Sequence, residues 1–198
     1  MYMKCNGNKD RERRTILLKI LHTEIPEVLI FEYEKQLEIR GYSYTNYSKY
    51  EFEKAGIHFE WVEENIYCPQ KAGTFYGIHF QNHPMSQAKI LYCISGRGFD
   101  YAVDLRKDSK TYKKWVCVEL SGENRRQIFI PKGFGHGFLS MEDDTKIVMR
   151  IDNYFNEDYR RSIRWDDKDI NIILPIEKPI LAKHDLEAPF LVNSDCNL

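Results

Sequence analysis

The sequence predicts a single all-β domain, a sandwich or barrel of the jelly-roll kind, from its length and from the pattern of its apolar segments. The chain has 198 residues, enough for one packed core, and no change in composition divides it. Eight or more short segments rich in β-branched and aromatic residues follow one another, separated by Gly, Pro, Asn, Asp or Ser. Helix-compatible patterns occur only at the margins, as in known β-sandwiches and barrels.

The N-terminal part is predicted to hold an extension, two strands and a short helix. Residues 1–20 are predicted as an extension, loosely ordered over its polar and charged start, and residues 21–198 as the domain. The apolar segments 15–22 and 28–34 have β character and are separated by the turn-favouring sequence TEIPE. The segment 48–56 ends in a glycine and fits one or two turns of helix.

The other strands are predicted between residues 57 and 151. They occupy residues 57–63, 74–80, 88–94, 99–105, 111–120, 126–131, 136–141 and 145–151. SGRG at 95–98 and SGEN at 121–124 carry turn-forming residues, so both are predicted as hairpin connections. From Tyr154 onward, charges alternate and prolines recur, which predicts short helical turns draped over the barrel and no second domain.

Composition argues against several classes of partner. The net charge of −1 provides no field that would gather nucleic acid or an anionic membrane surface. No apolar run approaches the roughly 20 residues that cross a bilayer, and the N-terminus does not resemble a secretory signal. The five cysteines form no CxxC pair, and their odd number argues against a disulfide framework. We therefore expect a cytoplasmic protein that binds neither nucleic acid nor membrane.

Two histidines and one lysine stand out as candidates for chemistry. His79 lies in a run of apolar, β-prone residues, and Lys89 opens the next such run ten residues later. A histidine takes and returns a proton near neutral pH, and an ammonium opposite it holds a developing negative charge. His136 lies among glycines that let a ligand approach the main chain closely. An inward-facing His79 in a small barrel predicts proton abstraction next to a carbonyl.

Four stretches of the sequence match the pattern of a known family in order and spacing. They are GIHFQ, the long run from QAKILYC to PKGFGHGF, IRWDDKDINIILP and LAKHDLEAPFL. Together they resemble the dTDP-4-dehydrorhamnose 3,5-epimerase family, a metal-independent group of cupins, over about Ile25 to Leu191. The resemblance implies a cupin-type jelly roll and an isomerase without cofactor. Its substrate would be a nucleotide-diphosphate 4-keto-6-deoxy sugar, epimerised at C3, C5 or both in O-antigen, capsule or cell-wall sugar biosynthesis.

The resemblance also implies roles for individual residues. His79 matches the catalytic base, and Asp185 matches the carboxylate that orients and charges it. Lys89 matches a lysine near the C4 oxygen of the sugar. The residues implied for substrate binding are His136, Asn65 and Arg40, the last at the nucleotide diphosphate.

The sequence departs from the family's pattern at several pocket positions. Inversion needs a second acid, and the residue that matches the family's tyrosine is Met149, whose thioether donates no proton. Tyr76 stands in place of an arginine, Glu63 in place of a glutamine and Gln36 in place of an aromatic residue. We therefore expect a substrate on another nucleotide, CDP or GDP. Tyr76 is our first candidate for the missing acid, with simple filling of space as its alternative, and Tyr154 is the second.

Two rival functions and the assembly stay open at this point. A catalytically silent sugar-nucleotide-binding cupin is one rival, although it would have no need for the base, the carboxylate and the lysine together. A metal-dependent cupin is the other, but His79 and His83 lack the His-x-His spacing and the Glu of the first cupin metal motif. The resemblance further implies a homodimer with exchanged N-terminal strands, in which residues 25–44, including Arg40, contribute to the neighbour's site.

Overall fold

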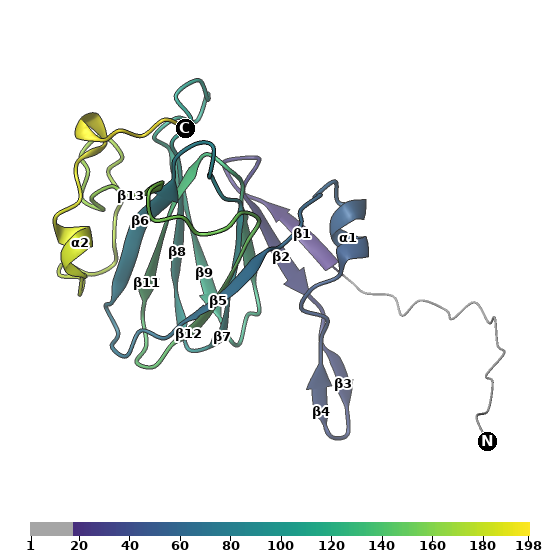
Figure 1. Ribbon diagram of the computed structural model, residues 1–198. Coiled ribbons are helices and arrows are strands. Elements are labelled where there is room, and N and C mark those ends of the chain that lie inside the picture. The colour runs from purple at the N-terminus through teal and green to yellow at the C-terminus, as the bar shows by residue number, and fades with distance from the viewer. Residues whose placement is uncertain (1–17) are drawn as a thin grey trace, which may run out of the picture.

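The computed structural model describes residues 18–198, and it consists of two antiparallel sheets that face each other as a jelly roll (Figure 1). The six-stranded sheet has the order β1 (Leu18–His22), β2 (Leu29–Tyr33), β10 (Gln127–Ile130), β7 (Lys89–Ser95), β12 (Lys146–Ile151) and β5 (Glu63–Tyr67). The five-stranded sheet has the order β13 (Arg160–Ser162), β6 (Phe75–Gln81), β11 (Phe134–Ser140), β8 (Arg97–Asp104) and β9 (Trp115–Ser121). The predicted fold class is confirmed.

The main core fills the space between the two sheets. Side chains from the inner faces of both sheets meet there, among them Leu91 and Met149 from the first sheet and Ala102, Val118 and Phe138 from the second. Strand residues alternate between the two faces of a sheet, so every second residue of these strands reaches this layer. At one end the layer opens into the cavity described below.

The outer faces of both sheets are covered as well. Phe31, Ile90 and Val148 on the outer face of the first sheet pack under Phe52 and Trp61. Phe52 belongs to α1 (Lys49–Lys54), the short helix expected from the sequence, where the Ser48 hydroxyl accepts a hydrogen bond from the Glu51 N–H. The outer face of the second sheet is covered by apolar residues of the C-terminal segment, namely Ile163, Ile170, Ile172 and Leu191.

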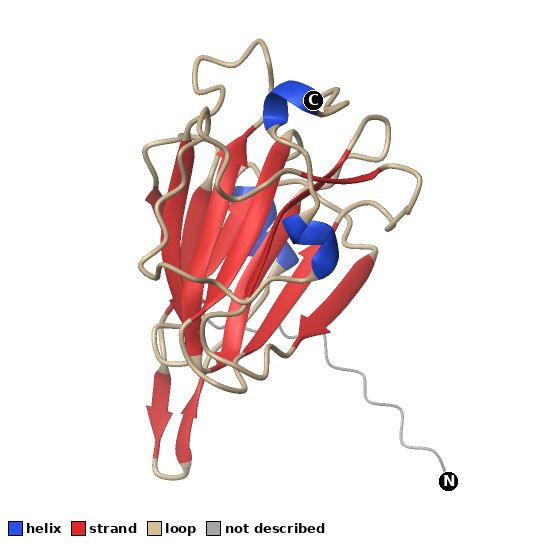
Figure 2. Cartoon of the chain, turned by 90° about the vertical axis from the view of Figure 1, so that its left-hand side faces the viewer, coloured by secondary structure: helices blue, strands red, loops and turns tan. Residues whose placement is uncertain are grey.

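The C-terminal segment does lie over the barrel as short turns. It contains α2 (Lys183–Leu186) and the 3₁₀ turn η1 (Leu191–Asn193), and both lie along one side of the sheets (Figures 1 and 2). The carboxylate of Asp167 holds this segment together, because it accepts a hydrogen bond from the Leu191 N–H at 2.6 Å. Strand β13, which the sequence did not predict, pairs with β6.

Three local predictions are wrong. Residues 57–62 form no strand; they cover the first sheet as irregular chain, which explains their apolar character, and β5 begins only at Glu63. SGRG and SGEN are not hairpin connections, because β7 and β10 belong to the first sheet whereas β8 and β9 belong to the second. Each of these turns therefore carries the chain from one sheet to the other.

A hairpin that the sequence did not predict projects from the barrel. It consists of β3 (Gln36–Glu38) and β4 (Gly41–Ser43), paired with each other and separate from the two large sheets (Figure 1). Its apolar side chains Leu37 and Ile39 are exposed to solvent. Residues 1–17, which include most of the predicted extension, lie outside the described part of the chain. Within residues 18–198, no helix is long and apolar enough to span a membrane.

Candidate active site

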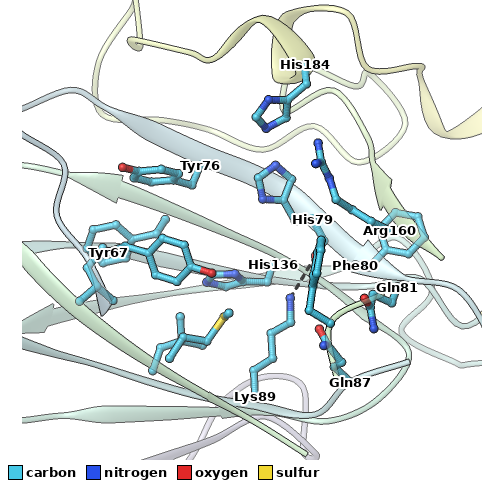
Figure 3. A pocket seen from close by; sticks show the side chains of 15 residues that line it. Tyr67, Tyr76, His79, Phe80, Gln81, Gln87, Lys89, His136, Arg160 and His184 are labelled. Atoms are coloured by element: carbon cyan, nitrogen blue, oxygen red, sulfur yellow. Dashed lines mark hydrogen bonds between the residues drawn. The ribbon is translucent and has the colours of Figure 1, made fainter. Parts of the chain in front are cut away.

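A cavity of about 300 Å³ lies between the two sheets, and side chains from both form its walls (Figure 3). The first sheet contributes Tyr67 from β5, Lys89 and Leu91 from β7, and Ile147 and Met149 from β12. The second sheet contributes Tyr76, His79, Phe80 and Gln81 from β6, His136 and Phe138 from β11, and Arg160 from β13. A largely apolar, concave site with a few convergent polar groups is the usual form of a small-molecule site.

A β-bulge in β6 turns both Tyr76 and His79 toward the cavity. His136 of β11 pairs with His79 and Phe138 pairs with Tyr76, so residues 77 and 78 stand opposite Gly137 alone. The extra residue shifts the alternation of the strand, and side chains three residues apart then share one face. Gly77 has φ +129°, and a Cβ atom there would lie 2.7 Å from the Cα of Gly137. A glycine at position 77 is therefore required.

His79 forms a close pair with Asp185 of α2. Its Nε2 lies 2.6 Å from Oδ1 of Asp185, whose side chain is 1% exposed. A carboxylate is an acceptor only, so Nε2 carries the proton and Nδ1 is the basic nitrogen. Oδ2 of Asp185 is buried and accepts no hydrogen bond from the described residues, while Nε2 of His184 lies 3.3 Å from Oδ1. The carboxylate thus fixes the tautomer of His79.

The surroundings keep the His79 imidazole neutral. Burial lowers the pKa of His79 from its ordinary value; Asp185 works against this, and the electrostatic effects of Lys89 and His136 add to it. An imidazole that is neutral near pH 7 can act as a base, because its unprotonated nitrogen is able to accept a proton.

Lys89 brings a buried ammonium to the same cavity. Only 5% of the residue is exposed, and burial lowers its pKa to about 8, against the opposing effect of Asp100. Its Nζ lies 3.4 Å from the main-chain oxygen of His79 (dashed in Figure 3). The ammonium therefore lies next to β6, the strand that carries His79, and could stabilise an oxyanion bound in the cavity.

Asp100 is a buried carboxylate that the sequence analysis missed. It is fully buried on β8, and its Oδ2 lies 2.9 Å from Nε2 of His136. Burial raises the pKa of Asp100, whereas His136 and Lys89 lower it. The sequence did contain a signal for this residue, namely a single acidic residue in the apolar strand FDYAV. A buried carboxylate needs cationic neighbours, so its presence there indicates a polar site.

The other predicted residues take different positions. Tyr76 and Met149 line the cavity, whereas Glu63 and Asn65 line an adjoining hollow that also touches Met149. Arg40 lies in the projecting hairpin, outside the cavity lining, and pairs with Glu38. Tyr154, the second candidate acid, is 61% exposed and does not line the cavity.

Among the cavity residues that were not predicted, three have ionisable side chains. Tyr67 ends β5, Arg160 begins β13, and His184 lies in α2. The first ends the mixed polar stretch EENIY and the second is one of several arginines in YRRSIR, so neither pattern distinguished them. His184 directly precedes the predicted Asp185, which was the available signal.

One group of side chains among residues 18–198 has donors close enough to hold a metal ion. His79, His184 and Asp185 each offer one ligand atom, and these atoms lie within 4.8 Å of one another. Two imidazoles and a carboxylate suit zinc or iron.

Comparison with known proteins finds relatives that match most of the chain. The family model for dTDP-4-dehydrorhamnose 3,5-epimerase matches residues 22–193. An enzyme of that name from Shigella flexneri is 39% identical over 179 residues, which cover 90% of this chain and 98% of the relative. Another, from Salmonella typhimurium, is 36% identical over 177 residues, covering 88% and 96% respectively.

Solved structures show the same similarity in three dimensions. The dTDP-4-dehydrorhamnose 3,5-epimerase of Bacillus anthracis, with TDP and PPi bound, superposes with a TM-score of 0.86 at 34% identity, covering 88% of this chain and 100% of that one. A 3,5-epimerase from Legionella pneumophila in complex with dTDP-4-keto-L-rhamnose has a TM-score of 0.86 at 32% identity, covering 90% and 95%.

Proposed function

This chain belongs to the dTDP-4-dehydrorhamnose 3,5-epimerase family, and from that membership we propose which of its residues perform the reaction. The chain is an isomerase that epimerises a nucleotide-linked 4-keto-6-deoxy sugar next to its ketone. The observation that carries the residue assignment is the 2.6 Å pair of His79 and Asp185 at the cavity wall.

His79 is the base in this proposal. Its Nδ1 removes the hydrogen beside the ketone, while Nε2–H stays bonded to Asp185. The carboxylate stabilises the imidazolium that forms, and it keeps the ring in the orientation that presents Nδ1 to the substrate. The lowered pKa of His79 favours the neutral ring that this step requires.

Lys89 supplies the stabilisation that a histidine lacks. A ketone α-hydrogen is on the order of 12 pKa units less acidic than an imidazolium, a gap of about 16 kcal/mol. An ammonium donating to the enolate oxygen in a water-poor cavity reduces that gap. The burial of Lys89 supports this role, and His136 with Asp100 completes the polar end of the cavity.

The nucleotide and the assembly are part of the same proposal. The solved relatives bind TDP or a dTDP sugar, so a dTDP-linked sugar is the first substrate to test, with CDP- and GDP-linked sugars beside it. The projecting hairpin with exposed Leu37 and Ile39 supports a homodimer in which N-terminal strands are exchanged. Arg40 would then contact the diphosphate in the partner's cavity. We also propose a cytoplasmic location, consistent with free thiols at Cys68, Cys93, Cys117 and Cys196.

Exchange of hydrogen with solvent tests the function. The protein is incubated in deuterated water with 4-keto-6-deoxy sugars on each nucleotide, and the C3 and C5 positions are followed by NMR. Deuterium at C3 or C5 together with an inverted product is expected. Absence of exchange on every nucleotide would contradict the proposal and leave a binding protein in its place.

A metal-dependent enzyme is the second candidate, favoured by the ligand atoms of His79, His184 and Asp185. Elemental analysis of the purified protein, with activity measured after chelation, separates the two. An enzyme that uses the imidazole as a base keeps its activity in the presence of a chelator.

A further inference from the structure

The two walls of the cavity carry different side chains, and inversion of a sugar carbon needs a group from each wall. A base on one side of the sugar ring removes the proton, and an acid on the other side must deliver a new one. His79 and Tyr76 project from the same strand, β6, onto the wall made by the second sheet. Tyr76, the candidate from the sequence, therefore shares a wall with the base. The donor should come from the first sheet.

The wall made by the first sheet offers few groups with a proton to give. Leu91, Ile147 and Met149 have none. Lys89 has protons, but the ketone oxygen requires its charge throughout the reaction. Tyr67 is the remaining acid on that wall.

The position of Tyr67 suits a donor. It ends β5 and pairs with Ile147, so it lies on the same face of the sheet as Asn65, the partner of Met149 in the same ladder. Figure 3 shows its ring reaching into the cavity with the hydroxyl toward His136, whereas the hydroxyl of Tyr76 points away from His79. Tyr67 and Met149 thus line the same cavity from two neighbouring strands.

The ring of Tyr76 holds the ring of Tyr67 in this place. Their centroids lie 5.9 Å apart at an interplanar angle of 57°, within the range of favourable aromatic pairs. Burial is the largest cause that raises the pKa of each phenol, so both keep their protons at neutral pH.

We propose that Tyr67 is the acid that protonates the sugar carbon on the face opposite His79, and that Tyr76 is a positioning residue for it. This inference rests on the proposed function. His79 takes the hydrogen as a proton, and the electron pair left behind forms an enolate whose oxygen is held by Lys89. The enolate carbon then bonds to the proton of the Tyr67 hydroxyl, and the ketone re-forms. Tyr67, which is 37% exposed, regains a proton from water, and His79 returns its own to water.

Separate measurement of exchange and inversion tests this assignment. Tyr67→Phe removes one hydroxyl and keeps the ring; we expect inversion to fall by about 10²- to 10⁴-fold, the usual contribution of a general acid. Deuterium should still enter the same carbon with its configuration retained, because His79 returns a solvent-exchanged proton to the face from which it took one. His79→Ala should lose both signals.

Variants at Tyr76 and on the outer surface complete the experiment. Tyr76→Leu should slow inversion at least tenfold and Tyr76→Phe should restore most of the rate, since only the ring is needed. Tyr50→Phe, on α1 and outside the cavity lining, serves as a matched control. If Tyr67→Phe inverts at the wild-type rate while the wild type is active, the assignment of Tyr67 is wrong and the proposed function stands. If the wild type neither exchanges hydrogen with solvent nor inverts the sugar carbon, the assignment of Tyr67 and the proposed function are both wrong.

Discussion

The ammonium of Lys89 lies 3.4 Å from the main-chain oxygen of His79, so the cation proposed to hold the oxyanion contacts the main chain of the proposed base across two different sheets. Their separation therefore depends on the packing of the two sheets. The predictions that follow examine this arrangement, the residues that hold it and the assembly around it.

Removal of the Lys89 charge should slow catalysis strongly. Lys89→Met keeps most of the side-chain volume but provides no stabilisation for the enolate oxygen, and we expect kcat to fall by about 10²- to 10³-fold. Steady-state kinetics measure this change. An unchanged kcat with a raised KM would instead assign Lys89 to substrate binding alone.

The activity should depend on pH on both sides of neutrality. His79 must be neutral to accept a proton, and because its pKa is lowered, kcat/KM should fall only below pH 6.5. Lys89 must be charged, so activity should also fall as the pH rises through about 8. In Lys89→Arg the guanidinium stays charged, and the decrease at high pH should disappear from the remaining activity. Its persistence would assign that decrease to another group.

Asp185→Asn should abolish most turnover without unfolding the protein. The amide can donate to Nε2 of His79 and so stabilise the wrong tautomer, with Nδ1 protonated. We expect kcat to fall by about 10³- to 10⁴-fold, while calorimetry with the nucleoside diphosphate gives an unchanged affinity. A variant that kept wild-type turnover would exclude Asp185 as the orienting group.

Gly77→Ala should destabilise the barrel and disturb the site together. The added methyl group meets Gly137 Cα and the main-chain oxygen of His136 at 2.7 Å, and φ is +129°. We expect the free energy of unfolding to fall by about 2–4 kcal/mol in urea titration. Gly56→Ala is the matched control, because Gly56 also has a positive φ but nothing within 4 Å of the added atom. Its cost should be about 1 kcal/mol, and equal losses would contradict the steric explanation.

The projecting hairpin should control the oligomeric state. Leu37→Glu places a charge on an 82% exposed apolar position that a partner would bury, so light scattering should report a monomer. Val192→Glu changes a comparably exposed residue on η1 and should leave the mass unchanged. A dimer that survives Leu37→Glu would contradict strand exchange through this hairpin.

Much of the barrel could be predicted from the sequence because alternation of apolar residues is a local signal. The segments around His79, Lys89 and His136 all became strands. Residues 57–62 did not, because a run of apolar side chains also suits irregular chain that covers a sheet. The turns at 95–98 and 121–124 carried the right residues, but turn chemistry does not say to which sheet the next strand belongs.

The site was predictable only in part for a similar reason. Asp185 lies 106 residues from His79, and only the family resemblance, now confirmed, linked the two. Tyr67 was missed because its proposed role depends on which strand lies beside β12, and the sequence does not show that β5 pairs there. Asp100 was missed because its neighbours His136 and Lys89 come from other strands.

Asp185 belongs to the C-terminal segment and not to the barrel, and this affects the order in which the enzyme folds during its synthesis. A ribosome adds residues 183–186 only after every strand of both sheets has been made. A nascent chain can therefore close its barrel and form its cavity while His79 still lacks its carboxylate. Competence for catalysis then requires a separate step, in which α2 packs against the barrel that has already formed.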